Sequence, residues 1–566
     1  MEPRKSRGQE GRRARLPRKA TVLPPNNSDL EAGNSSGSWS SARQHSPLVR
    51  KSGELGEASP AMVSGRQRGE GDTPYDPVDS ASEKSDAVIV PRRPENSRVT
   101  PEEPEEERTK AKGKPAQRNA SRTQGRQDAL THLERVGERA KRTKDERFNN
   151  LLSFVKVPLL EEAYRRLHKR AAPGVDGETW EQYGQDLEAR LADLQDRVHR
   201  GSYHPQPVRR AYIEKADGRK RPLGIPAVED KILQGAVRML LEPIYENGAF
   251  LGYSYGFRPG RSQHDALDAL YAALGRKTNW VLEADIRSFY DTIDHGWMQR
   301  FIEHRIGDRR LVKLLMKWLK AGVMEDGELH VVKEGAPQGA GISPLLANIY
   351  LHYVLDLWVR SWRNRHAQGE VYFVRYADDF VMGFQYEQDA RAMRAALAER
   401  LSTFGLELHP DKTRVLRFGR FARRDSVKDG RERPETFNFL GLTHISAEGQ
   451  DGRFRLVRRT SRKKRTAKLR SLRDEIRRRR HEPVEEQYRW LSSVVRGHYN
   501  YYGVPGNFQS LSVFRQQVRR MWHAALQRRS QRADWTSEQH TKFETKFPLP
   551  RARITHPHPL SRFTLP

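Results

Sequence analysis

Nearly all the aromatic side chains of this 566-residue chain follow residue 125, and this uneven distribution limits which part of it can fold. Only Trp39 and Tyr75 precede that point, and the other 47 Phe, Trp and Tyr come after it. The first 125 residues are rich in Ser, Gly, Pro, Arg and Glu, a composition that buries too little apolar surface to offset the entropy lost on ordering. We therefore predict that residues 1–125 form a disordered, basic, low-complexity tail and that folding begins near residue 125.

Charge and cysteine content narrow the class of protein. Lys and Arg number 103 against 73 Asp and Glu, a formal net charge of +30 that favours a polyanionic partner, with nucleic acid as the first candidate. The absence of cysteine excludes disulfides, cysteine-ligated zinc, iron–sulfur clusters and thiol nucleophiles. No segment approaches the roughly 18 apolar residues of a membrane-spanning helix, and the charged N-terminus lacks the apolar core of a signal peptide. We expect a soluble, cytoplasmic protein with no membrane partner.

Hydrophobic periodicity predicts a mixed α+β fold up to about residue 450. Apolar residues recur at helical spacing over residues 128–170, and Ser343-Pro344 is typical of the start of another helix. Short apolar runs predict β-strands, two of them joined as a hairpin across an Asp-Gly turn. The strands are expected at residues 211–225 (the hairpin), 280–284, 371–376 and 380–384. After about residue 450 the pattern is almost entirely helical.

Three acidic residues stand at the ends of these apolar strands. Asp285 ends the strand at 280–284, and Asp378-Asp379 form the tight turn between two other strands. Carboxylates beside buried strands are costly unless a positive charge lies close to them. Two Mg²⁺ ions, which prefer oxygen ligands, would supply that charge, activate a 3′-hydroxyl and stabilise a leaving pyrophosphate. The alternative is that Asp-Asp here is ordinary turn chemistry.

The residues around these aspartates resemble the motifs of group II intron-encoded reverse transcriptases. Residues 373–380, which read Phe-Val-Arg-Tyr-Ala-Asp-Asp-Phe, resemble the catalytic motif of that family, and residues 284–295 resemble its first catalytic block. Five further motifs occur in the family's order, at residues 221–226, 255–262, 335–346, 408–413 and 439–442. Seven ordered motifs across residues 170–445 argue against a chance similarity.

This resemblance implies a right-hand polymerase. The fingers and palm of the α+β reverse transcriptase would occupy residues 126–445, an α-helical thumb and maturase (X) domain residues 446–530, and a short tail residues 531–566. The cysteine-paired endonuclease found in some members of the family is not expected in a chain without cysteine. His556 and His558 are therefore interpreted as tail residues and not as nuclease ligands.

The resemblance also implies roles for single residues. The two magnesium ions would be held by Asp285 and Asp378, with Asp379 in a supporting role and the backbone carbonyl of Ile286 as a further candidate ligand. Phe289 matches the position that stacks under the incoming sugar and obstructs a 2′-hydroxyl, which favours dNTPs. The alternative is that Phe289 is a core aromatic and that its neighbour Tyr290 faces the site.

Further residues are candidates for binding the nucleotide. Lys215 and Arg221 lie on opposite arms of the predicted hairpin, so both can reach one triphosphate, although exposed basic residues are otherwise usually solvated surface. Gln338 and Gly339 would lie where nucleotide and template meet. Lys412 is assigned to primer or nucleotide phosphate.

A basic region follows the last motif. Residues 453–480 contain fifteen Lys and Arg against two acidic residues, and a helix of this composition can follow phosphates on one face while Leu472 and Ile476 pack inward. The predicted RNA-binding residues are Arg462, Lys463, Lys464, Arg465, Lys468, Tyr499, Tyr501 and Tyr502. The tyrosines resemble the maturase domain of the family and could stack on RNA bases. The alternative is that at least half of the aromatic cluster is the core of a three-helix thumb, to which Trp522 is assigned.

The predicted function is RNA-directed DNA synthesis. The substrates would be an RNA template, a DNA primer or target and dNTPs, and the protein would also bind a group II intron RNA to assist its splicing and mobility. Two alternatives remain. One is an RNA-binding splicing cofactor with a vestigial polymerase, and the other is a domesticated host reverse transcriptase without an intron of its own.

Overall fold

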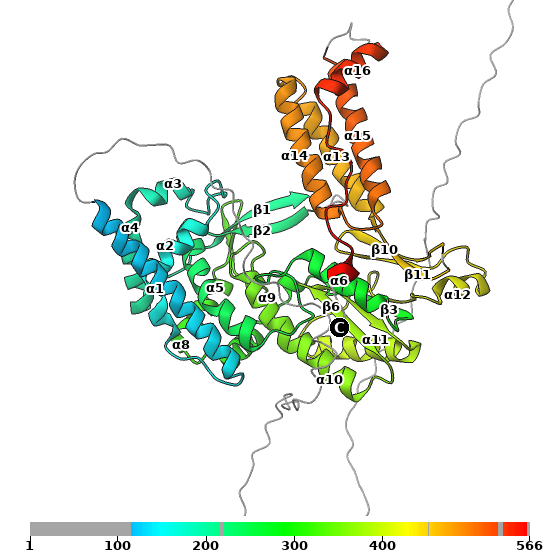
Figure 1. The fold of residues 1–566 in the computed structure, drawn as a ribbon. Helices are drawn as coiled ribbons and strands as arrows, with labels where there is room; N and C mark the ends of the chain where they lie inside the picture. The colour runs from blue at the N-terminus through cyan, green and yellow to red at the C-terminus, as the bar shows by residue number, and fades with distance from the viewer. Residues whose placement is uncertain (1–114, 215–219, 451, 530–535, 563–566) are drawn as a thin grey trace, which may run out of the picture. The chain divides into compact units, whose positions relative to one another are not determined.

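The computed structural model describes residues 115–214, 220–450, 452–529 and 536–562 (Figure 1). Most of the tail predicted over residues 1–125 is therefore outside the described residues. Helix α1 (Pro115–Arg142) already covers its last part. None of the helices in these ranges is long and apolar enough to cross a membrane.

The first helices pack around α5 (Val228–Gly248), which contacts both α1 and α2 (Val157–Arg166), while α4 (Leu187–Arg200) contacts α2. The helical stretch predicted over residues 128–170 is interrupted between α1 and α2. Pro158 stands in the first turn of α2, where its fixed φ favours a helix start and its missing N–H costs no hydrogen bond.

The central sheet has the strand order β6-β7-β3-β8, and its neighbouring strands are antiparallel. Its strands are β3 (Trp280–Asp285), β6 (Val371–Tyr376), β7 (Asp379–Phe384) and β8 (Arg414–Arg417). The hairpin predicted around Asp378-Asp379 is confirmed, because β6 pairs with β7 up to Tyr376 opposite Asp379. The strand predicted to end at Asp285 is confirmed as β3.

Side chains that alternate along these strands enter two different cores, as the period of two requires. Val281, Val374 and Val381 pack with residues of α6 (Gln263–Leu274). The intervening Leu282, Phe380 and Met382 belong to the cluster that holds residues of α9 (Ser343–Leu351) and α11 (Glu387–Ser402). Because both faces of the sheet are covered, β6 and β7 read as continuous apolar runs. The helix predicted to start at Ser343-Pro344 is confirmed as α9.

A second sheet carries the predicted hairpin and has the strand order β2-β1-β4-β5. Its strands are β1 (Val208–Glu214), β2 (Lys220–Ile225), β4 (Val323–Glu325) and β5 (Glu328–His330). Strands β1 and β2 pair antiparallel, with Ile213 opposite Arg221. The turn that joins them, residues 215–219 with Lys215, lies outside the described residues.

The prediction of an almost entirely helical region after residue 450 is wrong at its start. Strands β9 (Thr436–Phe439), β10 (Leu442–Glu448) and β11 (Phe454–Thr460) form a third, antiparallel sheet. In β11 the buried positions alternate, and one of them is Arg458, whose guanidinium is fully buried and paired with Asp268 at 3.2 Å. Because this buried position holds an arginine, the sequence lacks the alternation of apolar and polar residues that would have predicted a strand.

A three-helix bundle follows, made of α13 (Arg462–Arg478), α14 (Val484–Tyr502) and α15 (Phe508–Gln527). Its buried core includes Leu472, Ile476, Leu491, Val495, Phe514 and Trp522.

The remaining helices of at least four residues in the described ranges are α3 (Trp180–Tyr183), α7 (His295–Arg305), α8 (Arg309–Leu319), the π-helix His352–Asp356, α10 (Leu357–Arg365), α12 (Ala422–Lys428), α16 (Ser537–Lys546) and α17 (Pro559–Arg562), together with the 3₁₀-helix Leu151–Phe154.

The segment after α16 lies against the bundle and α6. The hydroxyl of Tyr499 donates to the carbonyl of Pro550 at 3.0 Å, and Thr555 donates its N–H to the carbonyl of Gly503 at 2.8 Å. The ring of His556 stacks on His264 of α6, with 3.5 Å between the ring centroids. His556, predicted as a tail residue, therefore belongs to a segment that is bonded to two parts of the fold.

We predict that Leu549→Ala lowers the free energy of unfolding by about 3 kcal/mol, because Leu549 is buried in the core of the bundle and the truncation leaves a cavity. Urea denaturation followed by circular dichroism measures this. The matched control is Arg553→Ala on the same segment, whose side chain is exposed and whose loss changes stability by less than about 0.5 kcal/mol. Equal effects of the two variants would contradict the docked segment.

Candidate active site

Strand pairing brings the three predicted aspartates together. Asp285 is the last residue of β3, and its Cα lies opposite that of Asp379, the first residue of β7. Asp378 is the second of the two turn residues between β6 and β7. The first, Ala377, has a positive φ of 57°, as type II′ hairpin turns require. Residues almost a hundred positions apart in the sequence thus meet at one end of the central sheet.

The carboxylates are electrostatically crowded. Burial raises the pKa of Asp379 to about 8, and the negative charges of Asp378, Asp285 and Glu283 add to this, while a hydrogen bond from the backbone of Leu440 opposes it. Burial also raises the pKa of Asp378, with a further contribution from Asp285. These shifts mean that the site favours protons, or another source of positive charge, at neutral pH.

One cation already lies in the site. The ammonium Nζ of Lys412 is 2.5 Å from Oδ2 of Asp285. The loop that carries Lys412 runs beside the end of β3, since the N–H of His409 donates to the carbonyl of Asp285 at 2.8 Å. The structure therefore places Lys412, predicted to contact phosphate, directly against a predicted metal ligand.

The donor set suits magnesium. Within the described ranges, no three His, Cys, Asp or Glu side chains converge as ligands of one ion. Magnesium does not require such a cage, because one or two carboxylates together with substrate phosphates and water normally complete its shell. The adjacent carboxylates of Asp285 and Asp378, with their charges unfavourably close, fit this description.

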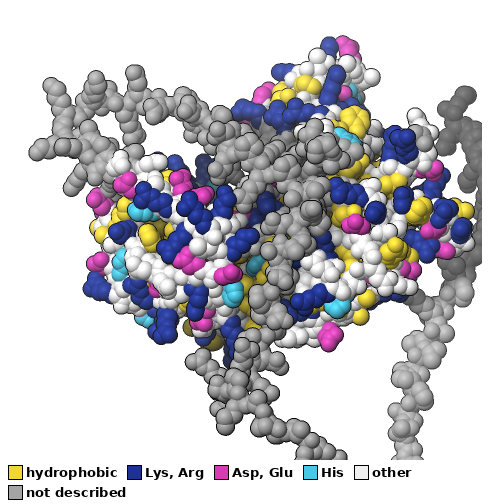
Figure 2. Space-filling view, turned by 60° about the horizontal axis from the view of Figure 1, so that its bottom comes forward, with side chains coloured by type: hydrophobic (Ala, Val, Ile, Leu, Met, Phe, Trp, Pro, Cys, Tyr) yellow, Lys and Arg dark blue, Asp and Glu magenta, His cyan; other side chains and the backbone are white. Residues whose placement is uncertain are grey.

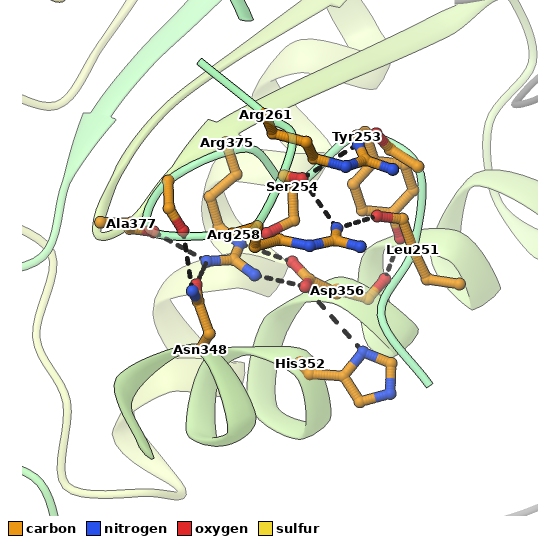
Figure 3. Close-up of polar contacts among 12 residues, drawn as sticks. Leu251, Tyr253, Ser254, Arg258, Arg261, Asn348, His352, Asp356, Arg375 and Ala377 are labelled. Carbon is orange, nitrogen blue, oxygen red and sulfur yellow. Dashed lines mark hydrogen bonds and ion pairs between the residues drawn. The ribbon is translucent and has the colours of Figure 1, made fainter. Parts of the chain in front are cut away.

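A buried polar network holds the turn Ala377-Asp378, the predicted catalytic turn, from behind (Figure 3). The guanidinium of Arg375 in β6 pairs with both oxygens of Asp356, at 2.7 and 2.5 Å, and both side chains are completely buried. Its Nη1 also donates to the amide oxygen of Asn348 at 3.0 Å and to the carbonyl of Ala377 at 2.9 Å. One side chain therefore connects the turn with α9 and the π-helix. Sequence reasoning assigned Arg375 no role, because nothing in the sequence indicates that it pairs with Asp356.

The backbone before α6 packs directly on this turn. The N–H of Tyr255 donates to the carbonyl of Arg375 at 2.8 Å, and the amide of Asn348 donates to the carbonyl of Gly256, also at 2.8 Å. A Cβ on Gly256 would lie 2.3 Å from the backbone nitrogen of Ala377. Only glycine permits this approach.

The loop that carries Gln338 and Gly339 is bonded to both neighbouring parts. The N–H of Gly224 in β2 donates to the carbonyl of Gln338 at 2.6 Å, and the N–H of Ala336 donates to the carbonyl of Tyr290 at 2.7 Å. Gly339 has a φ of 109°, and a Cβ there would lie 2.8 Å from the carbonyl oxygen of Gly224. The loop therefore spans from the β1–β2 hairpin to the segment after Asp285.

Phe289 and Tyr290 differ in position. Phe289 is 2% exposed and belongs to the main core cluster, with its ring edge-on to Tyr290 at 5.5 Å between centroids. Tyr290 is only half-buried; burial raises its pKa, with a further contribution from the charge of Asp378. The structure thus places Tyr290 within electrostatic reach of the aspartates and Phe289 beneath it.

Arg221 is exposed on β2, and its charge lowers the pKa values of both Asp378 and Tyr290, although other effects outweigh it. It therefore lies close enough to Asp378 and Tyr290 for its charge to act on both, and its predicted contact with phosphate stays a prediction. Its partner in the prediction, Lys215, lies outside the described residues and is not placed.

The predicted RNA-binding residues separate into two groups. Arg462, Lys463, Lys464 and Lys468 of α13 are exposed, and Arg465 is half-buried. Figure 2 shows Lys and Arg spread widely over the face that it displays, with fewer Asp and Glu among them. Tyr501 and Tyr502 are half-buried, and the Tyr501 hydroxyl donates to the carbonyl of Leu440. Tyr499 is 1% exposed, so the alternative of a bundle core applies to it and its ring has no free face for a base.

Comparison with known proteins identifies the family. The family model described as "Reverse transcriptase (RNA-dependent DNA polymerase)" matches residues 213–444. The chain is similar to Protein YkfC of Escherichia coli (strain K12), with 36% identity over 351 residues that cover 55% of this chain and 87% of YkfC.

Intron-encoded proteins are also similar to it. Group II intron-encoded protein LtrA of Lactococcus lactis subsp. cremoris is 39% identical over 231 residues, 40% of this chain and 38% of LtrA. Nuclear intron maturase 3, mitochondrial, of Arabidopsis thaliana is 28% identical over 181 residues, 28% of this chain and 25% of that protein. The match thus spans little more than a third of LtrA. With the motifs and the three aspartates brought together, these similarities show that the chain belongs to the reverse transcriptase (RNA-dependent DNA polymerase) family, in its group II intron-encoded branch.

Proposed function

We propose that the protein copies RNA into DNA by metal-assisted nucleotidyl transfer at Asp285, Asp378 and Asp379. The observation that carries this proposal is the crowding of three carboxylates at the joined ends of β3 and β7, where burial and mutual repulsion raise the pKa values of Asp378 and Asp379. Asp285 and Asp378 would hold two Mg²⁺ ions, which when bound would activate the primer 3′-hydroxyl and stabilise the leaving pyrophosphate. Asp379, bonded to the backbone of Leu440, would act in support.

The backbone carbonyl of Ile286 would be a further ligand of the metal ions. Ile286 forms an isolated antiparallel bridge with Leu408, and the hydrogen bonds run between the residues on either side, from Arg287 to Glu407 and from His409 to Asp285. In such a bridge the carbonyl of the central residue points away from the bridged strand. It therefore points to the side of β3 on which β7 and the catalytic turn lie.

Nucleotide binding would fall to the residues around this turn. Arg221, and Lys215 of the same hairpin, would bind the triphosphate, and Gln338 and Gly339 would line the place where nucleotide and template meet. The hydrogen bond from Gly224 to the carbonyl of Gln338 supports this, since it joins the hairpin to that loop. Lys412 would contact a primer or nucleotide phosphate from its position beside Asp285.

The bundle α13–α15 would serve as thumb and maturase domain. The exposed basic residues of α13 would bind the backbone of the template and of a group II intron RNA, whose splicing and mobility the protein would assist. The names of LtrA and of the nuclear intron maturase support this partner. The presence of all three aspartates argues against a vestigial polymerase.

We predict that Asp378→Asn reduces extension of a DNA primer on an RNA template by at least a thousandfold. It should leave the affinity for intron RNA unchanged, because RNA binding depends on the basic surface and not on the carboxylates. Gel-based primer extension and filter binding measure the two properties. The matched control is Asp326→Asn in the exposed β4–β5 turn, which should retain full activity. Extension by Asp378→Asn at the wild-type rate would refute the assignment.

The raised pKa of Asp379 predicts a pH dependence of stability in EDTA. Because the folded protein favours the protonated carboxyl, this stabilisation is complete below the ordinary pKa of 3.8 and is lost as the pH rises towards about 8. For a half-buried carboxyl we expect a loss of order 1 kcal/mol between pH 6 and 8. Urea denaturation at both pH values measures this loss, which should disappear in Asp379→Asn and shrink when Mg²⁺ is added. An unchanged loss in Asp379→Asn would contradict the prediction.

We predict that Phe289→Leu, which keeps an apolar side chain in the core, lowers the preference for dNTPs over rNTPs by about tenfold if Phe289 supports the sugar. Single-nucleotide incorporation with dGTP and GTP measures the ratio, and Tyr290→Phe is the comparison. A change in selectivity for Tyr290→Phe alone would favour the alternative, in which Tyr290 faces the sugar and Phe289 is a core aromatic.

A further inference from the structure

Phe257 has an unfavourable backbone conformation and an exposed ring. Its φ is 57°, in the left-handed region that bulky residues rarely adopt, and its side chain is 51% exposed. Asn or Gly would adopt this conformation at less cost. Neither backbone preference nor burial therefore explains why a phenylalanine occupies this position. Backbone outliers of this kind are concentrated at functional sites.

Strong contacts on both sides hold Phe257 in this conformation. On one side, Gly256 packs against the backbone of Ala377 and accepts a hydrogen bond from Asn348. On the other, Arg258 is 4% exposed, and its guanidinium binds Glu246 at 2.9 Å. The guanidinium also donates to the carbonyls of Leu251 and Ser254 at 2.6 and 2.8 Å (Figure 3). The neighbours are anchored inward, and the ring between them stays outside.

The ring also lies beside the catalytic turn. Its centroid is 6.3 Å from that of Tyr376, the residue directly before Ala377. The two rings are tilted by 45° to each other, so Tyr376 does not cover the face of Phe257 as a parallel neighbour would. The exposed aromatic surface is thus fixed within a few residues of the predicted metal ligands, through the same Asn348 that contacts Arg375.

We propose that Phe257 is a stacking platform for a nucleobase at the end of the primer–template duplex, where one face of the base is uncovered, next to the catalytic turn. Aromatic rings stack on any base, and such contacts are sequence-tolerant, as a polymerase requires. The strained conformation would be retained because it holds the ring out towards the nucleic acid. The proposal rests on the proposed function, since it requires the protein to bind a primer–template.

The experiment compares three substitutions in the full-length chain. Phe257→Tyr keeps the ring, Phe257→Leu keeps an apolar side chain without a ring, and Phe257→Asn removes the ring and fits the left-handed conformation. Fluorescence anisotropy with a DNA primer annealed to an RNA template gives the dissociation constant. We expect an increase of about tenfold for Leu and Asn and less than twofold for Tyr. The melting temperature of Phe257→Asn should equal or exceed that of the wild type.

A fluorescent base identifies the strand. Quenching of 2-aminopurine at the primer terminus or at the opposing template position should be relieved in Phe257→Leu for the strand that stacks on the ring. Affinity of Phe257→Leu equal to that of the wild type, or a melting temperature that falls in step with affinity in all three variants, would overturn the proposal. A wild-type protein that extends no primer would instead refute the proposed function.

Discussion

The buried ion pair between Arg375 and Asp356 is the interaction on which the active-site geometry depends. Two completely buried charges are tolerable only if they are paired and their remaining hydrogen-bonding groups are satisfied. Burial lowers the pKa of the neighbouring His352 to about 3, and the charge of Arg375 adds to this, so the histidine stays neutral. Asp356 therefore forms its ion pair with Arg375 and not with a charged His352. The guanidinium is then oriented to donate to Asn348 and to the carbonyl of Ala377, and the turn cannot shift without breaking the pair.

This rigid support of the turn keeps the three crowded carboxylates in place. Three carboxylates lie at one end of the sheet, where burial, and after it their mutual repulsion, raises the pKa values of Asp378 and Asp379 and disfavours their charged forms. A flexible turn would relieve the repulsion by moving apart. The network behind β6, the close approach of Gly256 and the pairing of β3 with β7 oppose that movement, so the negative charge stays concentrated where the proposed magnesium ions would bind.

Much of this arrangement follows from the sequence, because it depends on local patterns. Continuous apolar runs predict the buried strands β3, β6 and β7, and the aspartates at their ends follow directly. What could not be predicted depends on pairs distant in the sequence. Arg458 pairs with Asp268 across 190 positions and Lys412 pairs with Asp285 across 127, and no local pattern in the sequence indicates that these residues pair. Backbone conformation is equally hidden, since nothing in the sequence shows that Phe257 has a positive φ.

The family motifs therefore combine two kinds of residue. In the proposed reaction, Asp285 and Asp378 would act through their charge. Gly256 and Gly339 differ in that they lack a side chain, because a Cβ on either would meet the backbone of another motif at 2.3 and 2.8 Å. The first kind can change with the fold intact. The second kind joins separate parts of the chain, the hairpin β1–β2 to the loop of Gln338 and the segment before α6 to the catalytic turn. Because these contacts are between backbones, no rearrangement of side chains can replace them.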